Sequence, residues 1–120
     1  MGLIHVTVSL VSVGAPGVPY RADFLVDTGA TDCMAPSDEL AKAGIKPLGT
    51  TTYELADGSV QKLQFGLAQI EFMGEVTAGR VVFGPPGSEP LLGVTPLESV
   101  GITVDPANRT LKRLPAIPLK

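Results

Sequence analysis

The sequence predicts a single all-β domain of short strands with one or two short helices. Its 120 residues suffice for one domain but not comfortably for two. It contains 14 glycines and 11 prolines, which favour turns and end helices. Between these turns, short apolar runs rich in Val, Leu and Ile recur, and stretches suited to helices are few. We therefore expect one strand-rich domain over residues 1–120.

The N-terminal part of the chain predicts two strands and a helix. From Leu3 to Val13 apolar and polar residues alternate, which is typical of a half-buried strand. A turn rich in Gly and Pro follows from Gly14 to Pro19. Tyr20–Val26 predicts a second strand, which runs directly into Asp27-Thr28-Gly29. Pro36–Ala43 predicts a helix of about two turns with its proline at the first helical position.

The middle of the chain predicts a hairpin and further strands. Strand-like runs occur at Thr51–Leu55, Val60–Phe65, Ala68–Phe72 and Val76–Phe83. The first two runs are joined by Ala56-Asp57-Gly58-Ser59, and Asp-Gly between two such runs is a strong hairpin signal. A loop rich in Pro and Gly follows from Gly84 to Pro90.

The last third predicts a short helix and a closing hairpin. Thr95 and Glu98 have the spacing of a capping box, and Pro96 suits the first helical position. Gly101 would end this helix. Two closing strands are expected, at Ile102–Val104 and Thr110–Leu114.

Charge and composition argue against several classes of function. The net charge is −3 and the only adjacent basic pair is Lys112-Arg113, so no nucleic-acid surface is expected. No apolar run approaches the ~18 residues of a membrane span, and residues 1–10 do not resemble a signal peptide. Cys33 is the only cysteine, which excludes an intramolecular disulfide. We expect a soluble, cytoplasmic protein without nucleic-acid or membrane partners.

Asp27-Thr28-Gly29 is the segment that predicts chemistry. Asp27 comes at the end of an apolar strand, Thr28 can donate and accept hydrogen bonds, and Gly29 allows a close backbone approach. Two carboxyl groups that face each other cannot both ionise, so they share one proton. The ionised member can take a proton from water while the protonated member polarises a carbonyl group. Because the chain has one such motif, a two-fold axis would have to supply the second carboxyl.

The chain resembles the retropepsin-like family of clan AA aspartic peptidases, particularly its small single-domain bacterial and archaeal members. The segment from Leu25 to Thr31 is similar to the family's catalytic loop. Thr51 to Phe65 stands where the family has its flap, and Leu91-Leu92-Gly93-Val94 resembles the element that packs beside the loop. Val100 to Leu111 resembles the closing hairpin. The resemblance implies a closed barrel or sandwich with one lobe per chain.

The resemblance also implies an activity and roles for single residues. It implies a homodimeric aspartic endopeptidase that uses no cofactor or metal and hydrolyses extended peptides or proteins. Asp27 would be the catalytic residue, Thr28 would bond across the dimer axis, and Gly29 would contact the substrate backbone. The substrate-binding residues would be Ala30, Ala56, Asp57, Gly58 and Ser59.

The chain departs from the viral members of that family at two positions. Thr31 stands where they usually have an acidic residue, and Val94 stands where they usually have an arginine, so their ion pair is absent. A non-catalytic dimeric module that binds peptides on the same fold is therefore the alternative function. A third possibility is a β-barrel interaction domain in which Asp27 only ends a strand in a turn.

The remaining chemically active side chains have simpler interpretations. Asp32 is interpreted as a solvated residue of a loop or helix entry, and His5 as a surface histidine of the first strand. Cys33 has no histidine nearby in the sequence and is interpreted as a small apolar neighbour of the core. With one histidine, one cysteine and no clustered acids, no transition-metal site is expected.

Overall fold

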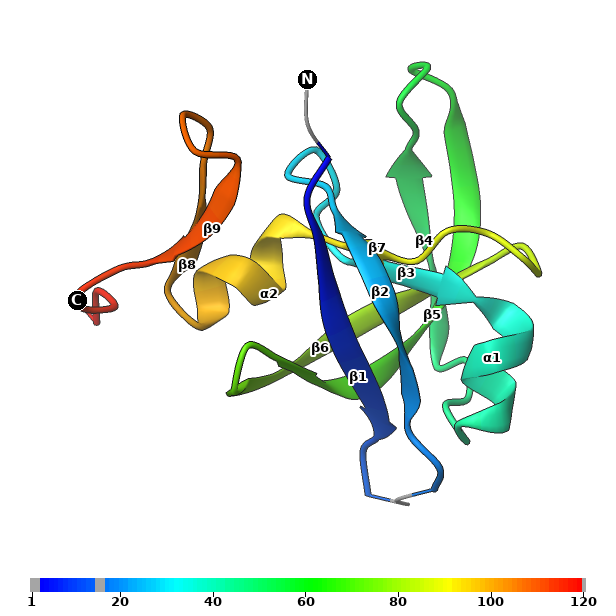
Figure 1. Ribbon diagram of the computed structural model, residues 1–120. Coiled ribbons are helices and arrows are strands. Elements are labelled where there is room, and N and C mark those ends of the chain that lie inside the picture. The colour runs from blue at the N-terminus through cyan, green and yellow to red at the C-terminus, as the bar shows by residue number, and fades with distance from the viewer. Residues whose placement is uncertain (1–2, 15–16, 120) are drawn as a thin grey trace.

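Strands make up about half of the computed structural model, which describes residues 3–14 and 17–119 (Figure 1). The elements in chain order are β1 His5–Ser12, β2 Tyr20–Val26, β3 Cys33–Pro36, α1 Ser37–Lys42, β4 Gly49–Glu54, β5 Val60–Phe72, β6 Glu75–Gly84, β7 Leu91–Leu92, α2 Val94–Ser99, β8 Ile102–Asp105 and β9 Thr110–Arg113. The prediction of an all-β fold with one or two short helices is confirmed, and the described residues contain α1 and α2. The predicted turn from Gly14 to Pro19 includes residues 15 and 16, which lie outside the described residues.

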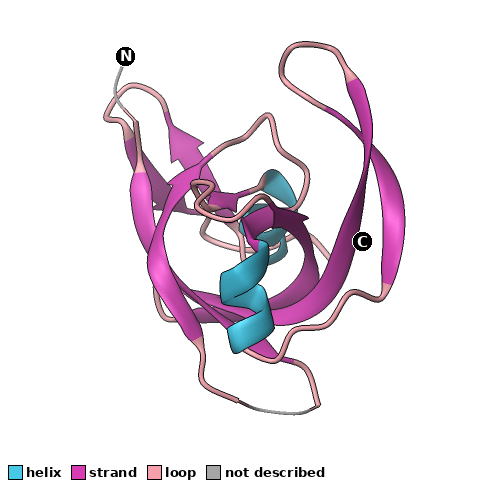
Figure 2. Cartoon of the chain, turned by 90° about the vertical axis from the view of Figure 1, so that its right-hand side faces the viewer, coloured by secondary structure: helices cyan, strands magenta, loops and turns pink. Residues whose placement is uncertain are grey.

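Six of these strands close into a barrel. They are hydrogen-bonded in the order β1-β2-β7-β3-β6-β5, and an antiparallel pairing between β1 and β5 joins the two ends of this row. β4 is the seventh strand of the sheet, and β5 is its one pairing partner in the part of the chain that the structure describes. Figure 2 shows the strands curving round into a ring, with α1 on the side that faces the viewer. The predicted closed barrel with one lobe is therefore present.

Alternating side chains of the strands fill the barrel. In β1, Val8 and Leu10 are fully buried, and in β5, Ala68, Ile70 and Phe72 are buried while their neighbours are less so. The largest fully buried side chains from the other elements are Phe24, Leu40, Leu92, Leu97, Ile102 and Val81. Burial of apolar surface at about 25 cal/mol per Å² is the main force that stabilises such a core.

β5 is one strand of 13 residues, whereas the sequence predicted two strands that break between Phe65 and Ala68. Gly66 lies inside this strand and is buried. A Cβ atom at Gly66 would lie 2.7 Å from the Lys46 carbonyl oxygen and 3.0 Å from Cγ2 of Ile45. Glycine within a strand often marks such a close approach. Glycine at this position therefore allows β5 to pack against the segment after α1, and the strand continues through it.

β3 is a strand that the sequence analysis did not predict. It spans four residues, pairs in parallel with β6 and meets β7 in antiparallel fashion. Because it is short and mostly buried, it lacks the alternation that identified β1. Its last residue, Pro36, has an extended backbone with ψ of 133° and is the N-cap of α1. The helix therefore begins one residue later than predicted, at Ser37.

Two hairpins project from the barrel toward the same end of the molecule, which is the top in Figure 1. One is formed by β4 and the first part of β5. The other is formed by β8 and β9, which make a separate two-stranded sheet next to α2. No helix in residues 3–14 and 17–119 has the length and apolar character needed to span a membrane.

Candidate active site

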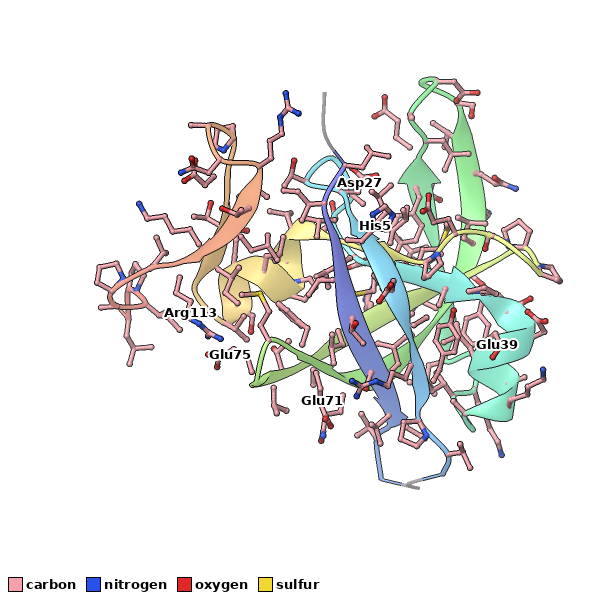
Figure 3. All side chains as sticks on the ribbon, viewed as in Figure 1. His5, Asp27, Glu39, Glu71, Glu75 and Arg113 are labelled. Atoms are coloured by element: carbon pink, nitrogen blue, oxygen red, sulfur yellow. The ribbon has the colours of Figure 1, made fainter. Side chains whose placement is uncertain are left out.

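Asp27 is the first residue after β2, at the end of the barrel from which the β4–β5 hairpin projects (Figure 3). The backbone of β2 is held from both sides where it ends. The amide of Leu25 donates to the Pro90 carbonyl at 2.9 Å, and the amide of Val26 donates to the Ile4 carbonyl at 2.8 Å. The amide of Asp27 itself donates to a carbonyl of β7 at 3.0 Å. The position of this carboxyl group is therefore determined by the barrel and not by a mobile loop.

The chain turns tightly immediately after β2. The Ala30 amide donates to the Asp27 carbonyl at 3.1 Å, and the Gly29 amide donates to Oδ1 of Asp27 at 2.9 Å. A Cβ atom at Gly29 would lie 3.2 Å from that same oxygen, so the glycine suits this contact. Among the described residues, Oδ2 of Asp27 has no hydrogen-bond partner, and the side chain is only half-buried. One carboxyl oxygen is thus fixed, and the other is open to a second group.

The loop after Asp27 rests on the start of α2. The Val94 amide donates to the Ala30 carbonyl at 2.8 Å, and the Thr95 amide donates to the Thr31 carbonyl at 3.0 Å. The first amides of a helix lack partners within the helix, and here the loop carbonyls satisfy them. The N-cap is Gly93 and makes no side-chain hydrogen bond. The capping box predicted from Thr95 is therefore wrong, since backbone carbonyls of the loop take its place.

Cys33 lies behind this loop and is fully buried in the hydrophobic core, as its interpretation as an apolar neighbour predicted. Burial raises the pKa of its thiol from the ordinary value of 9.0 to about 12, while a backbone hydrogen bond from Gly93 acts in the opposite direction. Thiolates are the reactive form of cysteine, and a buried thiol with a high pKa is inert. Cys33 is therefore a structural residue.

Asp32 is half-buried and bonded, which corrects its interpretation as a solvated residue. Its Oδ2 accepts a hydrogen bond of 2.8 Å from the hydroxyl of Tyr53, which lies on β4. Burial raises the pKa of the Tyr53 phenol above its ordinary value, the Asp32 carboxylate raises it further, and Arg80 acts in the opposite direction. Tyr53 was not among the residues singled out by the sequence. A half-buried tyrosine usually finds a hydrogen-bond partner for its hydroxyl. The sequence could not identify this partner, because Asp32 is distant from Tyr53 along the chain.

The four predicted residues of the hairpin tip are all exposed, at the far end of the β4–β5 hairpin. The amide and hydroxyl of Ser59 both donate to Oδ1 of Asp57, at 2.9 and 2.6 Å, and lower the pKa of its carboxyl group. Gly58 has a φ of +85°, which favours glycine. In the described part of the chain, no hydrogen bond joins Ala56 or the other tip residues to the loop of Asp27. Their role with a substrate stays a prediction.

Other titratable groups lie outside this site. His5 is exposed, as predicted, and its Nε2 lies 3.2 Å from Oε2 of Glu89. Within the described ranges, no three His, Cys, Asp or Glu side chains come together in a way that could hold a metal ion. The candidate site therefore consists of the Asp27 turn, its support on α2, and the contact between Asp32 and Tyr53.

Comparison with known families places this site in context. Residues 16–99 match the family described as "gag-polyprotein putative aspartyl protease". The matched segment includes the Asp27 turn, the β4–β5 hairpin and β7, and it ends with α2, before β8 and β9. A search of curated protein sequences finds no match.

Proposed function

The chain belongs to this family of aspartyl proteases, whose match covers more than half of it, and from that premise we propose that it is a homodimeric aspartic endopeptidase. The observation that carries the proposal is the carboxyl group of Asp27. It is held at the end of β2, one of its oxygens accepts the Gly29 amide, and the other is open. Peptide hydrolysis by carboxyl groups needs two of them at close range.

A second copy of the chain is the proposed source of the second carboxyl group. Thr28 and Gly29, which follow Asp27, are exposed and form the outer surface of the turn. If the turns of two copies met on a two-fold axis, the two Asp27 side chains would face each other. Thr28 would then be placed to form hydrogen bonds across the axis, because a hydroxyl both donates and accepts.

The proposed mechanism follows from the proton shared by the two Asp27 carboxyl groups. Like charges at close range keep one group protonated and the other ionised. The ionised group would take a proton from a water molecule, which attacks the peptide carbonyl carbon, while the protonated group donates to the carbonyl oxygen. The carboxyl group that took the water proton then passes it to the amide nitrogen as the carbon–nitrogen bond breaks, while the other carboxylate takes back the proton that it gave to the carbonyl oxygen. The pair therefore ends with one proton, as it began.

The proposed substrate is an extended peptide that lies between the β4–β5 hairpin and the turn of Asp27. Gly29 would contact its backbone, with Ala30 beside it, and the hairpin would act as a flap. The tip residues that would close over the peptide are Ala56, Asp57, Gly58 and Ser59. Such a lid would exclude water from the reaction. The projection of the hairpin toward the end of the barrel that carries Asp27 supports this role.

The test compares wild type with Asp27→Asn, a substitution that keeps the shape but removes the ionisable group. Both proteins would be incubated with a mixed peptide library from about pH 3 to about pH 8, a range that includes the upper apparent pKa of such a dyad, about 4.7. We expect cleavage by the wild type alone, and we expect it to decline on dilution together with the dimer mass measured by light scattering. Equal cleavage by Asp27→Asn would exclude the proposal.

A dimeric peptide-binding module is the second candidate. It is favoured by Thr31 and Val94, which stand where viral members of the resembled family usually have an ion pair. In the same experiment, a stable dimer that binds peptides but cleaves none of them at any pH would support this module over the peptidase.

A further inference from the structure

Tyr53 forms a side-chain hydrogen bond between the β4–β5 hairpin and the segment that follows Asp27. Its hydroxyl donates to Oδ2 of Asp32 at 2.8 Å, and both side chains are half-buried. Asp32 is itself held in place, since it directly precedes the buried β3 and its backbone packs against Gly93. The hydrogen bond therefore connects a projecting hairpin to a fixed part of the barrel.

Arg80 of β6 holds the same hairpin nearer its base. Its guanidinium lies 4.0 Å from the centre of the Phe65 ring and donates to Oγ1 of Thr51 at 2.8 Å. Thr51 and Tyr53 are two residues apart on β4, so their side chains lie on the same face of the hairpin. Arg80 also lies close enough to the Tyr53 phenol to oppose the rise of its pKa. Polar contacts that follow one another in this way reinforce each other.

Within residues 3–14 and 17–119, the outer part of the hairpin has no comparable support. Residues 55–60 are all exposed, and β5 is the one described strand that pairs with β4. A two-stranded hairpin is marginally stable by itself in water. The angle of this hairpin over the Asp27 turn therefore depends on contacts near its base. Among the side-chain hydrogen bonds of the described residues, the bond from Tyr53 to Asp32 is the one that joins the hairpin to the segment after Asp27.

We propose that Tyr53 is a positioning residue, whose hydroxyl latches the β4–β5 hairpin over the Asp27 turn through Asp32 while Arg80 anchors the hairpin at its base. This inference rests on the proposed function, in which the hairpin is the flap that closes over a peptide. The latch holds the hairpin in the orientation that captures substrate. It does not touch the reacting atoms.

The first test is Tyr53→Phe, which removes only the hydroxyl. Without the latch the hairpin samples open orientations, so capture of the peptide weakens while the Asp27 carboxyl group is unchanged. We expect KM to rise about tenfold and kcat to stay within about twofold of wild type. Asp32→Asn retains an acceptor oxygen without the charge, and its rise in KM should be smaller. An unchanged or lower KM for Tyr53→Phe would overturn the latch.

Tyr20→Phe is the matched control. Tyr20 is the only other tyrosine of the chain, which has no tryptophan. It lies on β2 with its ring 6.0 Å from that of Phe24, and its hydroxyl has no hydrogen bond to a described residue.

In the Tyr20→Phe variant, ultraviolet titration follows the Tyr53 phenol alone. Because Asp32 raises the pKa of that phenol, adding Asp32→Asn should lower it. An unchanged titration would show that the contact is absent in solution.

A measurement without substrate separates the latch from the peptidase. Backbone relaxation by NMR would compare residues 55–60 in wild type, Tyr53→Phe and Tyr20→Phe. We expect lower order parameters in Tyr53→Phe only. If the wild type cleaved no peptide but the tip became mobile in this variant, the latch would stand and the peptidase would fail. If cleavage required Asp27 but the tip stayed as rigid as in wild type, the peptidase would stand and the latch would fail.

Discussion

At the scale of single residues, the space beside the backbone determines how the Asp27 turn is supported. Gly93 joins β7 to α2 at the point where the loop after Asp27 passes closest. A Cβ atom at Gly93 would lie 2.4 Å from the Asp32 carbonyl oxygen and 2.8 Å from that of Ala30. Any side chain there would push the loop away from the helix amides to which it is bonded. Glycine is therefore required at this position for steric reasons.

Gly93→Ala should destabilise the protein and displace the Asp27 turn. Forcing a methyl group into a filled space costs about 1–3 kcal/mol in the free energy of unfolding. Gly79→Ala is the control, because a Cβ there would only meet Ile70 at an ordinary 3.8 Å. Denaturant unfolding of both variants measures the difference. Equal stability of the two would contradict the close approach at Gly93.

The buried thiol of Cys33 should make the free energy of unfolding fall at alkaline pH. In the folded protein its thiol has a pKa of about 12, whereas the unfolded chain should show the ordinary value of 9.0. Between these values the unfolded state loses the proton and the folded state keeps it, so stability is complete below about pH 9 and falls as pH rises toward 12. We expect the free energy of unfolding to fall by about 1 kcal/mol per pH unit more in wild type than in Cys33→Ala.

The comparison with Cys33→Ala is necessary because Tyr20 and Tyr53 also have raised pKa values and titrate in the alkaline range. Both phenols are present in both proteins, so their contributions cancel in the difference. Chemical denaturation at a series of pH values measures this difference in the free energy of unfolding between wild type and Cys33→Ala. Parallel pH profiles of the two proteins would show that the thiol is more accessible to solvent than its burial indicates.

At the scale of elements, the turn of the β4–β5 hairpin is stabilised by hydrogen bonds between its own residues. The Leu55 amide donates to the Ser59 carbonyl at 2.8 Å, and the Gly58 amide donates back to the Leu55 carbonyl at 2.9 Å. Asp57 accepts two hydrogen bonds from Ser59, so the tip is closed by neighbouring residues. Local chemistry therefore shapes the tip, whereas the orientation of the hairpin depends on distant residues.

Gly58→Ala should loosen this tip without unfolding the barrel. The φ of +85° at Gly58 costs about 1–2 kcal/mol for a residue with a side chain. We expect hydrogen exchange of the Leu55 amide to accelerate about fivefold or more. Gly87→Ala is the matched control, since its φ is +79° with nothing near the added methyl group, and it lies in another loop. Similar acceleration in both variants would argue against a local effect.

At the scale of the whole molecule, the chain holds half of the proposed site. A single Asp27 stands at one end of the barrel, beside two hairpins that project in the same direction. Since one carboxyl group cannot both activate water and protonate the carbonyl, the activity of the proposed enzyme has to depend on two chains. Dependence of the activity on two chains distinguishes the proposed enzyme from an enzyme whose active site is complete in one chain.

Mixing wild type with Asp27→Asn tests that dependence. If subunits exchange freely in an equal mixture, about one quarter of the dimers carry two intact carboxyl groups, and the activity should fall to about one quarter. Independent monomers would retain about half. Activity is measured at constant total protein after equilibration, with a mixture of wild type and Tyr20→Phe as the control. A linear response to the wild-type fraction would exclude a shared site.

Much of the fold was predictable because its signals are local. Alternation over β1 and the apolar run of β2 predicted both strands, and Asp57-Gly58 predicted the hairpin that the structure contains. The position of Asp27 immediately after β2 was predicted for the same reason. In contrast, β3 was missed because a short buried strand has no alternation. The continuity of β5 through Gly66 was also missed, because the Lys46 carbonyl that lies against this glycine is distant in the sequence.

The sequence by itself thus determined the strands, the turns and the carboxyl group at the end of β2, because propensity and alternation act between near neighbours. Only the tertiary structure decided that the barrel closes through β1 and β5, and that loop carbonyls, not a capping box, satisfy the first amides of α2. Only the tertiary structure paired Tyr53 with Asp32. These contacts join segments that are far apart along the chain, so their partners become neighbours only when the core packs.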